Sequence, residues 1–406
     1  MEKKFAAMTA LGTLALAASV VAAAAPAWAE NAPGVTATEI KIGQTSPYSG
    51  PASAYSANSK AEIAYFQMID EQGGINGRKI KIVSLDDGYN PAKTVEQTRK
   101  LIEDEQVAFI FSSIGTPTNV AIRKYLSDLK VPNVFVASGG DFWGDYQHYP
   151  WTIGLLPSYR VEAQIYAKYI LREKPDAKVA LLYQNDDFGK DYLNGLKDAF
   201  GADFDKRVVA QQTYQVTDPT IDSQIVSLQG SGADVFVAGT TAKFGAQAIR
   251  KTYDLGWKPL FFISYVSSSL GAVLQPAGVE KAVGLITAQY GKDAADPRWK
   301  DDPGMRQWRD FMTKYLPGVP QTDNNYVAGY QYAETLAQVL KQCGDDLSRE
   351  NIMRQAANLH DLHEDVLLPG IVINTSPTNY HPVKQMELAR FDGKSWVLFG
   401  EVIAAN

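Results

Sequence analysis

The stretch KIKIVSLDDGYNPAKTVEQTRKLIEDEQVAFIFSS (Lys79–Ser113) contains one complete unit of the pattern that decides the fold. Its two ends, 79–87 and 107–113, are short apolar runs rich in β-branched and aromatic residues. They lack the alternation typical of a strand with one face in water. The polar segment between them, from Pro91 to Asp104, has helical composition. Strand, helix and strand in this order predict two parallel strands buried on both faces.

The same unit recurs along most of the chain. In the first half we expect strands at 39–45, 79–87, 107–113 and 133–138, with helices at 58–71, 91–104 and 117–129. After Pro157, Ser158 is placed to cap a helix, and a second set begins. Its expected strands are 178–183, 208–214, 234–239 and 260–264, and its expected helices are 189–200, 221–229 and 242–255. The pattern predicts an α/β protein of two lobes, each built on a doubly wound sheet.

The last third of the chain departs from this alternation. Residues 283–290 are again extended, helices are expected at 304–315 and 324–341, and a hairpin turns around Asp392-Gly393. We expect the two helices to cover the first sheet, so that several crossings between the lobes form a hinge. The predicted division is a signal peptide at 1–29, lobe 1 at 35–155 plus 290–375, and lobe 2 at 156–289 plus 380–406.

The N-terminus has the features of an export signal. Lys3 and Lys4 precede an Ala-rich apolar run that ends in Ala27-Trp28-Ala29, the small-x-small pattern of a signal peptidase site. Because the cleavage pattern follows the run directly, export is favoured over a membrane anchor. We expect cleavage after Ala29 and a periplasmic protein. The only cysteine, Cys343, excludes an internal disulfide and leaves no thiol at the processing site for a lipid.

Charge and hydropathy narrow the partners. The formal net charge of −6 argues against nucleic acid, which requires a basic footprint. No apolar run after the signal approaches the roughly 20 residues that span a bilayer. We therefore expect an exported monomer, without a membrane span in the mature chain and without a cofactor.

The expected ligand site lies beyond the carboxyl ends of the strands, where loops and helix N-termini converge in open α/β sheets. The loops there carry neutral hydrogen-bonding groups: Ser49, Ser112, Ser113, Thr116, Ser138, Gly139, Gly140, Thr240, Thr241, Tyr265 and Ser267. Helix N-termini attract an anion through free N–H groups, so a carboxylate is the simplest guest. Aromatic side chains that could enclose an apolar body flank the same loops: Tyr55, Trp143, Phe188 and Tyr326.

Several segments together carry a resemblance to a known family. These are SPYSGPASAY, GGINGRKIKI, FSSIGTPTNVAIRKYL, VPNVFVASGGDFWGD and YQNDDFGKDYLNGLK, in this order. The chain resembles the periplasmic solute-binding proteins of the branched-chain amino acid (Leu/Ile/Val-binding) type, which serve ABC transporters. The resemblance covers almost the whole mature chain. It implies two α/β lobes with three hinge crossings that close on a ligand, and a permease in the inner membrane as partner.

The resemblance also implies roles for individual residues. Tyr55 matches the ring after the SGP loop, Ser113 and Thr116 match the first hydroxyl loop, and Ser138 to Gly140 match the loop facing the ligand carboxylate. Phe188 matches an aromatic position of the cleft, and Thr240 a position of the second lobe.

One position departs from the amino-acid-binding members. They place a carboxylate for the ligand ammonium where this chain has Val266, between Tyr265 and Ser267. A buried ammonium without a counter-charge loses several kcal/mol of solvation. We therefore expect a carboxylate without an amino group, foremost an aromatic acid of the benzoate, phenylacetate or hydroxycinnamate class. The segments VASGGDFWGD and YPWTIGLLPSY also resemble a subgroup that includes aromatic-acid binders. Two alternatives stay open, an amino acid with its counter-charge from Asp141 or Asp323, and a sensory receptor for a small organic acid.

An enzyme is the remaining class. The sequence has no G-x-S-x-G, P-loop or G-x-G-x-x-G motif, so no catalytic residue is predicted. The cluster HDLHED, with His360, Asp361, His363 and Glu364, is the one metal-like group. It lacks a distant further ligand, and we interpret it as a polar turn.

Overall fold

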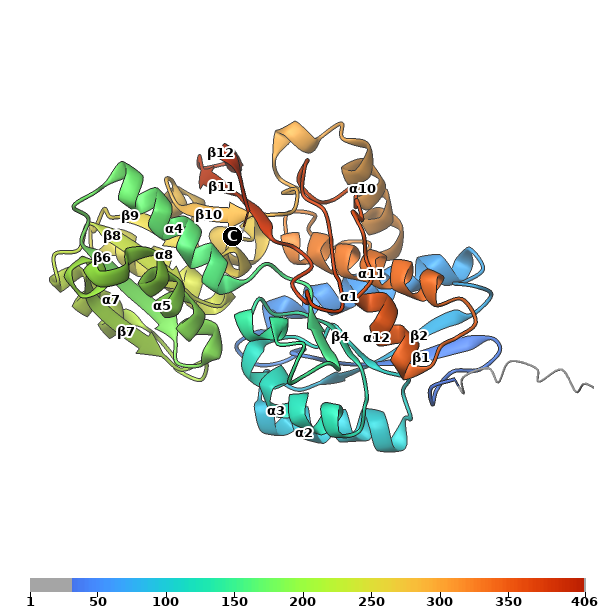
Figure 1. Cartoon of the computed structure of the whole chain (residues 1–406). Coiled ribbons are helices and arrows are strands. Elements are labelled where there is room, and N and C mark those ends of the chain that lie inside the picture. Colours follow the sequence, from blue (N-terminus) through green and yellow to red (C-terminus); the bar gives the residue numbers. More distant parts are fainter. Residues whose placement is uncertain (1–30, 405–406) are drawn as a thin grey trace, which may run out of the picture.

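The computed structural model describes residues 31–404, so the expected signal peptide lies outside the described residues. Figure 1 shows two lobes side by side, each with a central sheet between helices. The two-lobed α/β architecture expected from the alternation of strands and helices is confirmed. Among residues 31–404, no helix has the length and apolar character needed to cross a bilayer.

Lobe 1 holds a parallel five-stranded sheet in the order β2-β1-β3-β4-β5. Its strands are β1 (Glu39–Ser46), β2 (Lys79–Asp86), β3 (Ile110–Phe111), β4 (Asn133–Val136) and β5 (Thr152–Gly154). Its helices are α1 (Ser56–Glu71), α2 (Pro91–Arg99), α3 (Thr116–Asp128), α10 (Pro303–Tyr315), α11 (Asn324–Cys343) and α12 (Arg349–Ala356). Helices α2 and α3 cover one face, and α1 packs with α11 on the other. As expected, the late helices return to the first sheet.

Lobe 2 holds a seven-stranded sheet in the order β12-β11-β10-β9-β8-β6-β7. Its strands are β6 (Val179–Gln184), β7 (Val208–Tyr214), β8 (Val235–Gly239), β9 (Leu260–Ile263), β10 (Ile286–Gln289), β11 (Gln385–Phe391) and β12 (Trp396–Ala404). Its helices are α4 (Tyr159–Glu173), α5 (Asp187–Phe200), α6 (Phe204–Arg207), α7 (Asp222–Gly230), α8 (Ala242–Asp254) and α9 (Gln275–Ala277). All pairs are parallel except those that β11 makes with β10 and with β12, and β11 and β12 form the expected hairpin.

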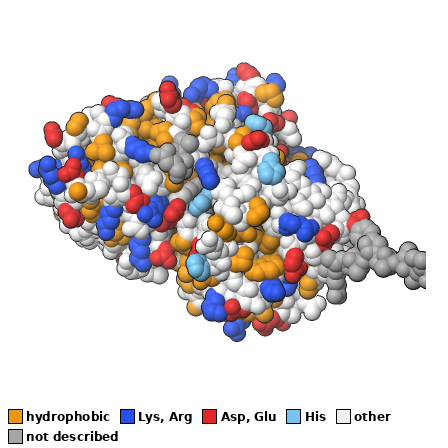
Figure 2. Space-filling model, in the orientation of Figure 1, with side chains coloured by type: hydrophobic (Ala, Val, Ile, Leu, Met, Phe, Trp, Pro, Cys, Tyr) orange, Lys and Arg blue, Asp and Glu red, His pale blue; other side chains and the backbone are white. Residues whose placement is uncertain are grey.

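Burial explains why the strand sequences do not alternate. All residues of β4 and β8 are buried, because helices cover both faces of each sheet. The chain passes between the lobes at three places, after β5, after β10 and before β11. Acidic and basic side chains are interspersed over the visible face of both lobes in Figure 2.

Local differences from the sequence expectation have physical causes. The strand expected at 107–113 is reduced to β3, and Ser112, which adopts a positive φ of 49°, interrupts the extended backbone directly after it. The helix expected at 91–104 is α-helical only to Arg99 and continues as a π-helix from Lys100 to Asp104. Helix α12, which the sequence reading missed, begins after Ser348, whose side chain accepts from Asn351 N–H.

Candidate functional site

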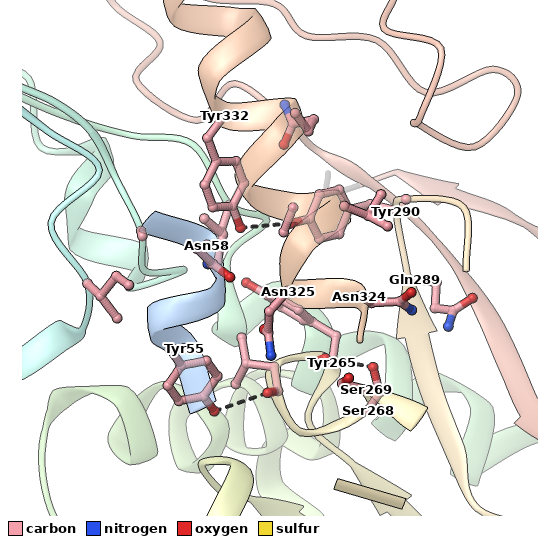
Figure 3. Close-up of a pocket in the computed structure, with 18 of the residues that line it drawn as sticks. Tyr55, Asn58, Tyr265, Ser268, Ser269, Gln289, Tyr290, Asn324, Asn325 and Tyr332 are labelled. Atoms are coloured by element: carbon pink, nitrogen blue, oxygen red, sulfur yellow. Dashed lines mark hydrogen bonds between the residues drawn. The ribbon is translucent and has the colours of Figure 1, made fainter. Parts of the chain in front are cut away.

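A pocket lies between the two lobes, at the carboxyl ends of several strands. It encloses about 1030 Å³ of space, part of it open to solvent. Lobe 1 contributes the start of α1, the N-terminus of α3 and the first turns of α11, and lobe 2 contributes the loop after β9 and the end of β10. Figure 3 shows labelled side chains from α1, α11, β10 and the loop after β9 around one space. This position is where open α/β sheets bind ligands.

The described residues that line the pocket include no carboxylate. Among its described lining residues there is no Asp or Glu, and the only Lys or Arg is Lys292. The Lys292 ammonium is already engaged, since it donates to Asp302 Oδ2 (2.8 Å) and to the carbonyl oxygen of Asp365 (2.6 Å). The polar atoms offered to a guest therefore come from neutral side chains and from the backbone.

Aromatic rings form much of the wall. Seven of the lining residues are aromatic: Tyr55, Tyr89, Tyr159, Phe188, Tyr265, Tyr290 and Tyr332. Tyr159 stacks on Tyr265, with ring centroids 5.5 Å apart, and Phe188 meets Tyr159 edge-on at 4.7 Å. Tyr290 approaches Tyr265 edge-on at 5.7 Å. Because these rings hold one another, the wall is rigid and suited to a flat apolar body.

One end of the pocket is formed by the N-terminus of α3. Gly115, the N-cap residue of α3, has a φ of 105°, and no side chain caps this helix. Gly115 and Thr116 both line the pocket, so the N-terminus of α3 is open to a guest. Thr116 Oγ1 lies 2.7 Å from Ser138 Oγ, which fixes the hydroxyl position. Free N–H groups and the helix dipole at such an end attract a carboxylate.

Tyr55 joins the two lobes across the pocket. Its hydroxyl donates to the carbonyl oxygen of Val266 (3.0 Å) and accepts from Ala242 N–H (2.9 Å), the first residue of α8. Two more interlobe bonds lie beside it. Ser269 Oγ donates to Asp323 Oδ1 (2.8 Å), and a backbone bond joins Gly271 N–H to the Thr322 carbonyl (2.9 Å). The lobes are therefore in direct contact around the pocket.

The structure places the sequence-predicted residues in two groups. Six line the pocket: Tyr55, Thr116, Phe188, Thr241, Tyr265 and Val266. The others do not line it: Ser49, Ser112, Ser113, Ser138, Gly139, Gly140, Trp143, Thr240, Ser267 and Tyr326.

Most residues of the second group make hydrogen bonds within the protein. Ser138 Oγ accepts from Trp143 Nε1–H (3.0 Å) and from Gly140 N–H (3.2 Å). Ser113 Oγ accepts from the N–H of Thr45 (3.0 Å), and Ser267 Oγ donates to the Thr240 carbonyl oxygen. Gly139 packs against the hydroxyl of Tyr265 and against the hinge at Pro157, and Tyr326 accepts on its carbonyl oxygen from Trp308 Nε1–H.

Neither acid weighed as a counter-charge lines the pocket. Asp323 caps α11 by accepting from Asn325 N–H (3.0 Å), and burial raises the pKa of its carboxyl. Asp141 lies near the hinge, where Ser158 Oγ donates to its carboxylate at 2.6 Å. Both carboxyl groups thus already accept hydrogen bonds from neighbouring residues of the protein.

The metal-like cluster is dispersed in space. Glu364 is buried against α11, where it accepts from Gln331 and Thr335, whereas His360 is exposed and contacts Asn358. Within residues 31–404, no group of three or more metal-ligating side chains is found.

The sequence reading missed several pocket residues that share one helix face. Asn324, Asn325, Ala328, Gln331 and Tyr332 all line the pocket from α11. Their spacing of one, four, seven and eight residues is that of a single helical stripe. This stripe was the signal in the sequence that could have indicated the site, because polar amides on the otherwise buried side of a helix need hydrogen-bond partners. Asn58, Tyr89, Tyr159, Gln289 and Tyr290 were also missed.

Comparison with known proteins identifies the class. Residues 39–395 match the family model described as periplasmic binding protein, and the chain belongs to this family. It is similar to the Leu/Ile/Val-binding protein homolog 3 of Brucella melitensis, with 28% identity over 234 residues. That match covers 55% of this chain and 60% of the relative, somewhat less than two thirds of the relative's length.

Solved structures show the same fold. A branched-chain amino acid ABC transporter protein from Thermus thermophilus with bound valine has a TM-score of 0.80 at 19% identity, covering 91% of this chain and 97% of that one. A fatty acid ABC transporter substrate-binding protein from Thermomonospora curvata has a TM-score of 0.76 at 19% identity, covering 93% and 95%. The chain therefore has the two-lobed type I fold of the periplasmic binding protein family.

Proposed function

We propose that this protein is the extracytoplasmic receptor of an ABC importer and that it binds a small carboxylate without an amino group, foremost an aromatic acid. Family membership supports the receptor role. The observation that carries the ligand class is the absence of Asp and Glu among the described residues that line the pocket.

An α-amino acid fits this pocket poorly. Enclosing its ammonium would cost several kcal/mol of solvation, and only neutral oxygens are in place to offset the loss. The nearest alternative, Asp323, is held by Ser269 and Asn325. The relatives named for branched-chain amino acids make amino-acid binding the second candidate, and a direct test must separate the two.

A carboxylate and a ring each have a matching surface. The uncapped N-terminus of α3 suits the anionic head. The wall of Tyr159, Phe188, Tyr265 and Tyr290 suits a planar body. A straight-chain acid is the nearest aminoless rival, since one similar structure is that of a fatty acid ABC transporter protein.

Ligand capture follows from the hinge. A guest that contacts both lobes stabilises the closed arrangement, in which Tyr55 reaches Val266 and Ser269 reaches Asp323. Moving such an equilibrium from mostly open to mostly closed takes about 5.5 kcal/mol of differential binding. A permease would then recognise the closed lobes. A sensory partner would recognise the same closed form. Measuring transport of the acid by a strain with and without this protein distinguishes the transport role from the sensory role.

The decisive experiment is a thermal-shift and calorimetry screen of the mature chain. The panel contains phenylacetate, benzoate, cinnamate and hexanoate, with leucine, valine and phenylalanine as the amino acids. A ligand at 100 times its Kd adds about 2.7 kcal/mol to the stability, which gives a clear shift. We expect aromatic acids to stabilise the chain. Stabilisation by amino acids alone would refute the ligand class and leave the receptor role intact.

A further inference from the structure

A buried carboxyl group lies directly behind the lobe 2 wall of the pocket. It belongs to Glu162, in the first turn of α4, and the residue is 0% exposed. Glu162 does not line the pocket, but its Oε1 accepts from the N–H of Tyr265 (2.8 Å), which does. The hydroxyl of Tyr265 donates to the carbonyl oxygen of Pro157 at the hinge (2.8 Å). This wall residue is therefore held at both ends, by Glu162 and by the hinge.

Two tyrosine hydroxyls complete the surroundings of Glu162. Tyr166, one turn further along α4, and Tyr192, on α5, each place the hydroxyl oxygen in hydrogen-bond contact with the carboxyl. The Tyr166 hydroxyl also lies 2.8 Å from the carbonyl oxygen of Ile263, at the end of β9, and accepts from the N–H of Ala288 in β10 (3.1 Å). One buried carboxyl thus joins four segments: α4, α5, the loop after β9 and β10.

These four segments supply much of the lobe 2 wall. The lining residues on them are Tyr159 on α4, Phe188 on α5, Tyr265 and Val266 after β9, and Ala288, Gln289 and Tyr290 at β10. Val266 also accepts the interlobe hydrogen bond from Tyr55. A change in the hydrogen bonding of Glu162 therefore acts on the wall and on lobe closure together, without contact with the guest.

The number of hydrogens in this network indicates a proton on Glu162. The Tyr166 hydroxyl has one hydrogen, and both the Ile263 carbonyl oxygen and Glu162 Oε1 lie within reach of it. A carbonyl oxygen only accepts, so when Tyr166 donates to Ile263 the carboxyl must donate to Tyr166. Burial raises the pKa of Glu162 from 4.5 to about 8, although Tyr166, Tyr192 and the Tyr265 N–H donate to it. The neutral carboxyl satisfies the whole network, whereas the carboxylate does not.

The other titratable groups around Glu162 stay neutral over the same pH range. They are the phenols of Tyr159, Tyr166, Tyr192 and Tyr265, and burial raises the pKa of each above its usual value of 10. Among residues 31–404, Glu162 forms no ion pair. Its own ionisation is therefore the one change of charge that this network undergoes between pH 7 and pH 9.

We infer that Glu162 is a positioning residue of the ligand site, which as a neutral carboxyl fixes the lobe 2 wall and keeps negative charge away from an anionic guest. This inference rests on the proposed function. When the proton leaves, Tyr166 must donate to the carboxylate and gives up the Ile263 carbonyl oxygen. A negative charge then stands behind the backbone of Tyr265, where little water screens it. Both effects weaken binding of a carboxylate as pH rises.

Calorimetry on the mature chain at pH 6, 7, 8 and 9 tests the inference. The probes are phenylacetate, benzoate and cinnamate, and the series is run with each acid that binds at pH 7. We expect the wild-type affinity to fall about fivefold or more from pH 7 to pH 9. Glu162→Gln is neutral at every pH and still accepts from Tyr265 N–H. It should bind within about threefold of the wild type at pH 7 and lose less than about twofold by pH 9.

Two further variants separate positioning from stability. Glu162→Leu cannot accept from Tyr265 N–H and should bind about tenfold more weakly at pH 7. Glu62→Gln is the matched control, because Glu62 is equally buried in lobe 1 and burial raises its pKa to about 8 as well. Its donors, Gln44 and Ser112, do not line the pocket, so this variant should keep the fall of the wild type. Circular dichroism and thermal melts establish folding, and Glu162→Gln decides the matter if Glu162→Leu does not fold.

Each outcome has a distinct meaning. A wild-type affinity that stays constant from pH 7 to pH 9 would overturn this inference and keep the proposed function. An equal fall in the wild type and in Glu162→Gln would also overturn it, because another group would then titrate. Normal affinity in a folded Glu162→Leu variant would show that Glu162 does not position the wall. Binding of valine at pH 7 without binding of any of the three acids would overturn the proposed ligand class, and this inference with it.

Discussion

The hydroxyl of Tyr55, at the start of α1, donates a 3.0 Å hydrogen bond to the carbonyl oxygen of Val266 in the opposite lobe. The same hydroxyl accepts from the N–H of Ala242 at the N-terminus of α8. One side chain of lobe 1 thus serves two backbone groups of lobe 2. Both bonds break when the lobes separate, so they favour the closed form only.

Removal of this hydroxyl should weaken ligand binding. In Tyr55→Phe the ring remains in the pocket wall, but Val266 and Ala242 lose their partner. We expect affinity to fall about five- to tenfold, mainly through faster dissociation, which stopped-flow fluorescence measures. Tyr48→Phe is the matched control, because that hydroxyl contacts Ser84 within lobe 1. Unchanged dissociation in Tyr55→Phe would mean that the interlobe bonds do not hold the closed form.

A carboxylate at position 266 should reverse the ligand preference. Val266→Asp introduces a negative charge into a pocket wall whose described residues carry none, so binding of an aminoless acid should weaken by tenfold or more through repulsion and desolvation. Binding of phenylalanine should strengthen, since its ammonium gains a counter-charge. Val266→Asn has nearly the same shape as Val266→Asp but carries no charge. It should therefore change the affinity for either ligand much less. Calorimetry with phenylacetate and phenylalanine measures both, and equal effects of Asp and Asn would contradict the prediction.

The fold was predictable because it depends on repeated local patterns. Apolar runs such as Val235–Gly239, followed by helices, recur often enough to define two sheets. The lengths of individual strands were harder to predict from the sequence. The positive φ of Ser112, which ends β3, arises from the local path of the chain and leaves no composition signal.

The site was predictable in part, for a different reason. Loops after strands locate the N-terminus of α3 and Tyr265, but α11 reaches the pocket only because the chain crosses the hinge twice. Local sequence patterns do not show that a late segment of the chain packs back on lobe 1. The pocket residues of α11 therefore became visible only when α11 was seen packed on α1 beside the pocket.

A buried carboxyl of lobe 1 should make stability depend on pH. Burial raises the pKa of Glu62 from 4.5 to about 8, even though Gln44 and Ser112 donate to it. Between these values the unfolded chain releases the proton and the folded chain keeps it, so the free energy of unfolding falls as pH rises from about 4.5 to about 8.

Glu62→Gln removes this titration. Urea unfolding at pH 5, 6.5 and 8 should show a shallower loss of stability in the variant, by up to about 1.4 kcal/mol per pH unit. Glu401→Gln, an exposed position on β12, should keep the slope of the wild type. A variant slope equal to that of the wild type would show that Glu62 is ionised in the folded protein.

The backbone conformation of Gly115 leaves the N-terminus of α3 open to the ligand, and we expect any side chain at this position to disturb it. Its φ of 105° is unfavourable for other residues, and a Cβ there would run into the ring of Tyr89 and come within 2.7 Å of Thr118 Oγ1. We expect Gly115→Ala to lower the free energy of unfolding by roughly 1–3 kcal/mol and to weaken carboxylate binding, because α3 or Tyr89 must shift. Gly230→Ala, at the end of α7 with open space around it, should be neutral or stabilising. Urea unfolding and calorimetry with phenylacetate measure both effects, and a Gly115→Ala variant with normal stability and normal binding would mean that the carboxylate does not bind at α3.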